Sequence, residues 1–247
     1  MRFCLSLNLE KNEFPLDYRR VILSYIKNAI SNCNNGKYYD SYFKDTIQKD
    51  YCFSVVLPKP KYTKDKILIE NKEIKILFST DDKKKTGFIL FSAFISQKNR
   101  SFLIPNNNSM TLKNISNQKD QEITNSKVIF KTSKGSGLCV RDHNKETNMD
   151  THYIFNDEKF QEKFKVVLKN QAIQAGFSDH EVESIKFNPI QCKKVVAKHY
   201  RSYIDTTVGM FEMQGNSKLL QYFYNAGIGS RKSAGFGMID LVTQDLL

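Results

Sequence analysis

The residue types best suited to binding chemistry form a glycine-rich segment near the end of the chain. Four glycines fall within eleven residues, together with cationic and hydroxyl side chains. Glycine tolerates positive φ and lets another backbone approach closely, and backbone amides and cations together can bind phosphates. The candidate ligands of a phosphate-bearing molecule are Gly227, Gly229, Arg231, Lys232, Ser233, Gly235 and Gly237. A tight turn between a helix and a strand would give the same pattern, so both interpretations stay open here.

The elements around this segment exclude two common nucleotide-binding motifs. The pattern of apolar residues predicts a helix over residues 216–226 and a strand over residues 237–242, so the segment follows a helix and precedes a strand. The Rossmann and Walker motifs have the reverse order, and the Walker motif also needs a Gly-Lys-Ser/Thr ending that is absent here. The segment alone therefore does not identify its ligand.

The charge of the chain favours a polyanionic partner. The formal net charge is +12, from 38 Lys and Arg against 26 Asp and Glu, and the isoelectric point is about 9.3. Such a positive field concentrates polyanions near the protein. We expect nucleic acid, although a lysine-rich proteome would produce the same composition.

The five cysteines do not have the spacing of a metal site or a disulfide framework. No Cys-x-x-Cys pair is present, and no histidine stands at ligand spacing from a cysteine. We expect reduced, mostly buried thiols and neither a metal nor a cofactor. No apolar run approaches the roughly 18 residues of a membrane span, so we expect a cytoplasmic protein without a membrane partner.

The first half of the chain alternates between two kinds of apolar periodicity. Phe3, Leu5, Leu7 and Leu9 repeat with period two, which predicts a strand, and residues 21–30 then repeat at helical spacing. Strands are predicted over residues 51–57 and 74–79, a helix over about 87–97, and a return strand or hairpin over 102–115. This is the βαββαβ order of the ferredoxin-like fold, which RNA-recognition modules share.

The second half repeats the scheme after a polar linker at residues 114–126. A strand is predicted over residues 127–132, a helix over 157–175, strands over 193–200 and 203–214, and then the helix and strand that flank the glycines. The predicted fold is therefore α+β, with two tandem ferredoxin-like (RRM-like) domains. Their predicted bounds are residues 1–120 and 127–247, the second carrying the glycine-rich segment.

Six segments of the chain are similar to one known protein family. They are Asn225–Gly229, Gly235–Met238, Met1–Phe3, Asn28–Ile30, Tyr51–Ser54 and Val140–Asn144. With these segments the chain resembles the CRISPR-associated repeat-processing endoribonucleases of the repeat-associated mysterious protein (RAMP) superfamily. The resemblance implies tandem ferredoxin-like domains and one metal-independent cut within each repeat of precursor crRNA, leaving 5′-hydroxyl and 2′,3′-cyclic phosphate ends. It also implies that CRISPR repeat RNA is the partner, with other subunits of an interference complex, and it is compatible with a monomer or a homodimer.

Metal-independent cleavage uses the 2′-hydroxyl of the RNA as nucleophile, so the protein must move protons and stabilise negative charge. Many members of the family place a histidine between the first helix and the second strand, with a tyrosine on the helix and a lysine before the strand. By resemblance these positions fall at Lys44, Lys27 and Lys49, and none of the four histidines lies in this segment. We hypothesise a lysine-based site of Lys27, Lys44 and Lys49 with Tyr39 or Tyr42. The same lysines could instead form a solvated basic surface that binds phosphate without catalysing cleavage.

Further RNA contacts are predicted outside the glycine-rich segment. Lys134 lies in a short Lys-Gly-Ser-Gly loop, and Arg141 and His143 lie in a segment that resembles the family. Lys194, with Lys193, Lys198 and Arg201, surrounds a predicted strand, for which an ordinary exposed face is an equal interpretation. Two alternative functions stay open: a catalytically weak RNA-binding subunit of a CRISPR complex, and a generic nucleic-acid module, which the glycine signature disfavours.

Overall fold

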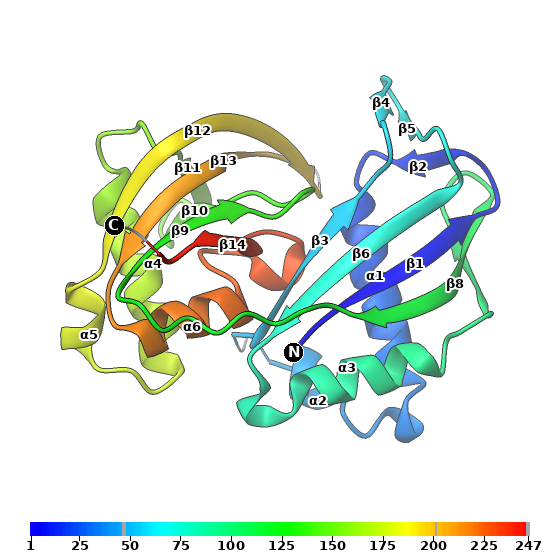
Figure 1. Ribbon diagram of the computed structural model, residues 1–247. Coiled ribbons are helices and arrows are strands. Elements are labelled where there is room, and N and C mark those ends of the chain that lie inside the picture. The colour runs from blue at the N-terminus through cyan, green and yellow to red at the C-terminus, as the bar shows by residue number, and fades with distance from the viewer. Residues whose placement is uncertain (46–47, 201, 246–247) are drawn as a thin grey trace.

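The computed structural model of the chain describes residues 1–45, 48–200 and 202–245. The chain forms two halves that lie side by side, each a sheet packed against helices (Figure 1). This mixed content of helices and strands confirms the α+β class. No helix within the described ranges is long and apolar enough to cross a membrane.

The first half is built around a five-stranded antiparallel sheet. Its strands, in spatial order, are β3 (Tyr51–Val56), β6 (Glu73–Thr80), β1 (Arg2–Leu9), β8 (Asn108–Asn117) and β7 (Ser101–Ile104). The helices α1 (Tyr18–Ser31) and α3 (Thr86–Ile95) bury their apolar sides against this sheet. Phe3 on β1 stacks on Phe78 with ring centroids 5.1 Å apart, and Phe78 lies 5.1 Å from Phe94 of α3. Burial of such rings is the main source of stability of this half.

Short elements surround the first sheet. They are the three-stranded sheet of β2 (Glu13–Pro15), β5 (Lys66–Leu68) and β4 (Lys61–Tyr62), the 3₁₀ turns η1 (Asn34–Gly36) and η2 (Asp82–Lys84), and the helix α2 (Tyr39–Phe43). None was predicted, because elements of two to five residues are too short to show a hydrophobic period. The helix α2 lies in the segment between α1 and β3, where the lysines of the hypothesised catalytic site were predicted.

The second half is built around a four-stranded antiparallel sheet. Its strands, in spatial order, are β12 (Lys186–His199), β13 (Ser202–Gln214), β9 (Lys127–Thr132) and β14 (Ile239–Thr243). The helices α4 (Phe160–Gln174) and α6 (Ser217–Ala226) share its core, with the short α5 (Asp179–Glu183) beside α4. The remaining elements are a separate hairpin, β10 (Val140–Asn144) and β11 (Met149–Tyr153), and the turn η3 (Lys232–Ala234).

The two halves share one connectivity. In each, a helix joins the first strand to the second and another helix joins the third strand to the fourth, when the long strands are counted along the chain. In each, the spatial order of these four strands is second, third, first, fourth. All neighbouring pairs are antiparallel.

Two predicted boundaries were wrong. The predicted linker begins inside β8, because Ile115 and Asn117 still pair with β1. The residues there are polar because most are exposed, not because the chain leaves the sheet. The strand β12 begins at Lys186 instead of residue 193, because a register shift between Pro189 and Gln191 accommodates a proline within the strand.

Two buried arginines of the first half join the halves. The Nη2 of Arg2 donates to the carbonyl oxygen of Ile239 at 2.8 Å and contacts the carboxylate of Asp240 at 3.1 Å. Arg19 on α1 donates to the carbonyl oxygens of Gly235 and Gly135 at 3.3 and 3.2 Å. Both arginines therefore fix the second half against the first, and Arg19 does so through the glycine-rich segment.

We predict that Gly237→Ala destabilises the protein far more than Gly176→Ala. Both glycines have positive φ, 69° and 90°, but a Cβ at position 237 would lie 2.0 Å from the carbonyl oxygen of Ile228, whereas position 176 has open space. Backbone strain alone costs about 1 kcal/mol, and the added clash raises the loss at Gly237 to about 3 kcal/mol. Urea denaturation of both variants checks this, and equal losses would contradict it.

Candidate functional site

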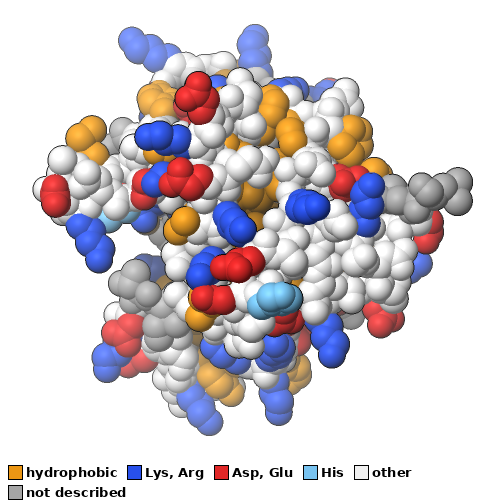
Figure 2. All heavy atoms as spheres, turned by 90° about the vertical axis from the view of Figure 1, so that its left-hand side faces the viewer, with side chains coloured by type: hydrophobic (Ala, Val, Ile, Leu, Met, Phe, Trp, Pro, Cys, Tyr) orange, Lys and Arg blue, Asp and Glu red, His pale blue; other side chains and the backbone are white. Residues whose placement is uncertain are grey.

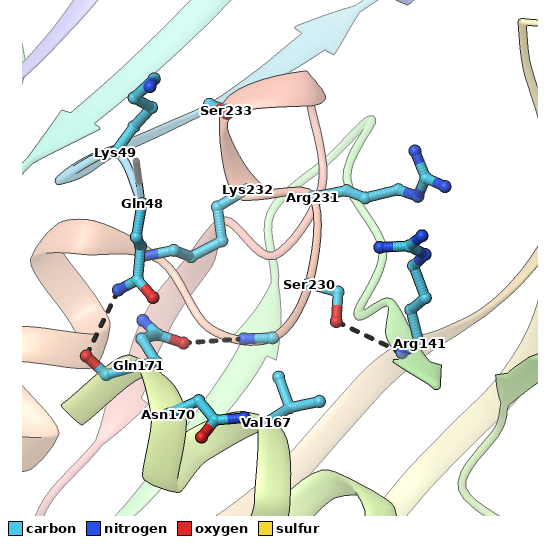
Figure 3. A pocket seen from close by; sticks show the side chains of 11 residues that line it. Gln48, Lys49, Arg141, Val167, Asn170, Gln171, Ser230, Arg231, Lys232 and Ser233 are labelled. Atoms are coloured by element: carbon cyan, nitrogen blue, oxygen red, sulfur yellow. Dashed lines mark hydrogen bonds between the residues drawn. The ribbon is translucent and has the colours of Figure 1, made fainter. Parts of the chain in front are cut away.

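A pocket of about 300 Å³ lies where the two halves meet the glycine-rich segment. Its walls come from the residues before β3, from the start of β10, from α4, and from the loop after α6 (Figure 3). The lining residues are Gln48, Lys49, Arg141, Val167, Asn170, Gln171, Gly229, Ser230, Arg231, Lys232 and Ser233. Four of these are cationic, so the pocket is suited to an anion.

The loop that forms one wall is held by a buried glutamine. The helix α6 ends at Ala226 and is followed by its C-cap residue Gly227, whose φ is 80°. The side chain of Gln171 on α4 donates to the carbonyl oxygen of Gly227 at 2.5 Å and accepts from the amide of Gly229 at 3.2 Å. Sequence reasoning missed Gln171, although its spacing from Phe164 and Leu168 places this amide on the apolar face of the helix, where a polar side chain needs partners.

The four glycines are buried and are required by close packing. A Cβ at Gly227 would lie 2.6 Å from the Cβ of Cys52, and one at Gly235 would lie 3.0 Å from the ring of Phe53. The amides of Gly229, Gly235 and Gly237 donate to Gln171, Lys232 and Gly137, at 3.2, 3.2 and 2.9 Å. Since these amides are engaged within the protein, the loop presents its side chains to a ligand. Direct RNA contact by the glycines stays a prediction.

Two arginines on the pocket are bound to one aspartate that the sequence analysis did not single out. Asp150 on β11 pairs with Arg141 at 2.6 Å, with Arg231 at 2.7 Å and with the Nδ1 of His143 at 2.8 Å. Hydrogen bonding from Arg141, reinforced by His143 and the charge of Arg231, holds the pKa of Asp150 well below its usual range. The structure thus brings together three residues predicted to contact RNA, through the pairing of His143 with Asp150 in the hairpin.

Lys232 is the most unusual cation of the pocket. Its side chain is 5% exposed, and its Nζ has no hydrogen-bond partner among the described residues. The Nζ lies 5.7 Å from the ring centroid of Tyr222, a weak cation–π contact. Burial lowers the pKa of Lys232 to about 8, because desolvation disfavours the charged form.

The segment before β3 brings the first half to the pocket. Gln48 donates to the hydroxyl of Tyr222 at 3.1 Å and to the carbonyl oxygen of Gln171 at 3.3 Å. Lys49 is half-buried and its Nζ donates to the carbonyl oxygen of Asp45 at 3.4 Å. Burial lowers the pKa of Lys49, against the opposing charges of nearby aspartates.

The other predicted catalytic residues lie around α2, and the structure brings them together only in part. Lys27 is exposed on α1, with its Nζ 5.3 Å from the ring centroid of Phe43 on α2. Lys44 is exposed at the end of α2, and Tyr39 packs on Phe43. Neither Lys27 nor Lys44 lines the pocket.

Tyr42 is buried and lines a neighbouring pocket of about 250 Å³ that Lys49 also lines. Its hydroxyl donates to the Oγ1 of Thr86 at 2.8 Å, and Thr86 contacts the carboxylate of Asp50 at 2.8 Å. Burial raises the pKa of Tyr42 to about 12. This chain of hydrogen bonds positions Asp50, the residue after Lys49.

Two predicted RNA contacts lie away from the pocket. Lys134 is exposed beside Pro58 and Glu73, where it lines a different pocket. Lys194 is exposed on β12 and pairs with Asp205 at 2.7 Å. Arg201 lies outside the described residues.

The surface does not carry one continuous positive patch on the side of the C-terminal half. Figure 2 shows Lys and Arg side chains interspersed there with Asp and Glu side chains. The cations of the pocket therefore differ from these surface Lys and Arg side chains in two ways: they are more buried, and they lie together at the junction of the two halves. Within the described ranges no three His, Cys, Asp or Glu side chains gather in a way that could hold a metal ion.

The family model described as "CRISPR associated protein Cas6, C-terminal" matches residues 117–241, half of the chain. The chain belongs to the Cas6 family. This confirms the predicted family of CRISPR repeat-processing endoribonucleases within the RAMP superfamily. The match covers the glycine-rich segment, α4 and the β10–β11 hairpin, which supply most of the pocket.

Solved structures agree with this fold over the whole chain. A structure described as a Cas6-related gene from Pyrococcus furiosus has a TM-score of 0.81 at 20% identity, covering 99% of both chains. An RAMP protein described as binding different RNA substrates has a TM-score of 0.81 at 20% identity, covering 98% of this chain and 100% of its own. A CRISPR associated protein Cas6 has a TM-score of 0.75 at 18% identity, covering 98% and 99%. No curated protein matches by sequence.

We predict that Lys232→Met stabilises the protein at pH 7. The folded state lowers the pKa of this lysine from 10.5 to about 8, so folding below pH 8 must bury an ammonium without a hydrogen bond. Removing it should add roughly 1–3 kcal/mol to the free energy of unfolding. Between pH 8 and 10.5 the unfolded state binds more protons, so wild-type stability rises with pH and the gain shrinks.

Thermal and urea unfolding at pH 7 and pH 10 check this difference. The exposed Lys218→Met on α6 is the matched control and should change stability by less than about 0.5 kcal/mol at either pH. A Lys232→Met variant that is less stable than wild type at pH 7 would show that the buried ammonium has a favourable partner.

Proposed function

We propose that the chain binds CRISPR repeat RNA and cleaves precursor crRNA once within each repeat, without a metal ion. The products would carry 5′-hydroxyl and 2′,3′-cyclic phosphate ends. The observation that carries this proposal is the pocket at the junction, where Lys49, Arg141, Arg231 and Lys232 surround a space that fits a phosphate group. Membership of the Cas6 family and the fold of an RNA-binding RAMP protein support it.

Each half of the chain is proposed to be one ferredoxin-like domain, residues 1–120 and 127–247. The support is the shared strand order and the shared placement of two helices in each half. Such sheets and their connecting loops bind single-stranded or looped RNA in many proteins. The RNA would therefore cross the junction between two such domains.

The two arginines that Asp150 orients, Arg141 and Arg231, are proposed to bind a phosphate group of the RNA. Guanidinium groups bind phosphate through paired N–H donors, and the Nε atoms of Arg141 and Arg231 have no partner among the described residues. Ser233, His143, Lys134 and Lys194 would extend this contact along the RNA backbone, and the glycines would keep the loop in place.

The cleavage chemistry is proposed to rely on lysines instead of the usual histidine. Lys49 reaches the pocket directly, whereas Lys27 and Lys44, with Tyr39, would bind the RNA strand that passes α2. Tyr42 would act through Thr86 and Asp50 by holding the segment of Lys49. Ammonium groups suit this role because the phosphorane carries an additional negative charge.

A second candidate function is a catalytically weak RNA-binding subunit of a CRISPR complex. The observation that favours it is the absence of a histidine from the segment between α1 and β3. His152 and His199 do not replace it, because burial lowers the pKa of both, for His199 to about 4. A neutral, enclosed imidazole is a poor proton donor.

The two functions predict different results with purified protein and repeat RNA in EDTA. A nuclease of the proposed kind makes a single cut per repeat, and the upstream product ends in a cyclic phosphate that acid opens. The measurement is gel electrophoresis with end-group analysis. Tight binding of intact RNA would identify the second candidate.

We predict that Lys49→Ala slows RNA cleavage far more than it weakens RNA binding, and that Lys44→Ala slows cleavage less than Lys49→Ala does. Because Lys49 lines the pocket, its loss should slow single-turnover cleavage about 100-fold and weaken RNA binding only about threefold. Lys44→Ala, outside the pocket, should slow cleavage less. Filter binding and single-turnover cleavage rates on the same RNA check this. Equal losses of binding and cleavage in both variants would show that both lysines act in RNA binding alone.

A further inference from the structure

The pocket of about 250 Å³ that Tyr42 lines shares Gln48 and Lys49 with the pocket at the junction. Its lining residues also include Tyr38 and Ile89. The volume is smaller than the roughly 300–1,000 Å³ of most ligand pockets, so this second pocket suits one flat ring system better than a whole nucleotide. An RNA strand bound at the junction would pass directly beside it.

The carboxylate of Asp50 is the feature of the second pocket that phosphate binding does not explain. Both of its oxygens contact the Oγ1 of Thr86, at 2.8 and 2.9 Å. Thr86 in turn accepts from the hydroxyl of Tyr42 at 2.8 Å, so the single hydroxyl proton of Thr86 is directed at Asp50. An ionised carboxylate has about four acceptor sites. Two buried side chains thus hold in place a carboxylate that can still accept from a ligand.

A carboxylate in this position disfavours the RNA backbone and favours hydrogen-bond donors. It repels a phosphate, whereas Lys49 and Lys84 on the same pocket can bind the phosphates that flank a base. The 2′-hydroxyl of RNA offers one donor. Among the four bases only guanine presents two neighbouring donors, N1–H and N2–H, on its Watson–Crick edge, the edge by which proteins recognise unpaired RNA bases. Two such donors match the two oxygens of one carboxylate.

We propose that the second pocket binds an unpaired guanine of the repeat beside the cut, recognised by the carboxylate of Asp50. This rests on the proposed function and adds to it the base that the site selects. Tyr38 and Ile89, both partly buried against the first core, supply the aromatic and aliphatic surface on which an extruded base packs. No bond changes here: the pocket positions the RNA while the cleavage chemistry stays at the junction.

The test replaces each guanosine of the repeat in turn by inosine or by adenosine. Inosine lacks the 2-amino group, and adenosine reverses the donor and the acceptor on this edge. With wild-type protein we expect one guanosine beside the mapped cut at which inosine lowers the single-turnover kcat/KM about 10-fold and adenosine about 100-fold, because one or both hydrogen bonds to the carboxylate are lost.

Asp50→Asn distinguishes recognition of the base from a structural role. The amide can still accept from Thr86, but it offers one donor and one acceptor, which match adenine. At the same position this variant should cleave the guanosine RNA about 10-fold more slowly than wild type and the adenosine RNA at least as fast as the guanosine RNA. Asp81→Asn is the matched control, because Asp81 lines the adjoining pocket and not this one. It should keep the preference of wild type for guanosine.

A preference for guanosine that Asp50→Asn leaves unchanged, or that Asp81→Asn loses to the same extent, would overturn the role of Asp50. The absence of any sensitive guanosine beside the cut would do the same. If wild type cuts no repeat RNA, the proposed nuclease activity fails. The same RNA series measured by filter binding still tests the pocket in that case, so the two failures are distinguishable.

Discussion

The structure depends on the close contact between the glycine-rich loop of the second half and strand β3 of the first. Gly227 lies against Cys52 and Gly235 against the ring of Phe53, at distances that leave no space for a Cβ. Arg19 also donates to the carbonyl oxygen of Gly235. These contacts bring the segment before β3 and the loop after α6 to opposite walls of one pocket. Neither wall alone would form the site.

This constraint also explains how positive charge gathers in a partly enclosed space. Asp150 offsets the charge of Arg141 and Arg231 and sets the direction of both guanidinium groups. Lys232 has no such acidic partner and is enclosed by the packing of η3 on β3. A folded protein gains no stability from such an ammonium unless a partner compensates its charge.

Much of the fold was predictable from the sequence, whereas the site was predictable only in part. Period-two and helical patterns identified the long elements, because each buries one face. The arginines and Lys232 were identified by type and by their place between glycines. The burial of Lys232 could not be foreseen, since lysine is usually exposed and its enclosure arises from a contact with Cys52 and Tyr222, far away in the sequence. Gln171 and Asp150 were missed because their partners lie on other elements.

The hydrogen bond from Arg2 to Ile239 joins the first strand of the chain to the last. A ribosome releases residues in order, so the earlier half emerges with its arginines before the carbonyl groups they bind have been made. A nascent polypeptide that has not yet reached β14 therefore lacks the carbonyl group that Arg2 binds.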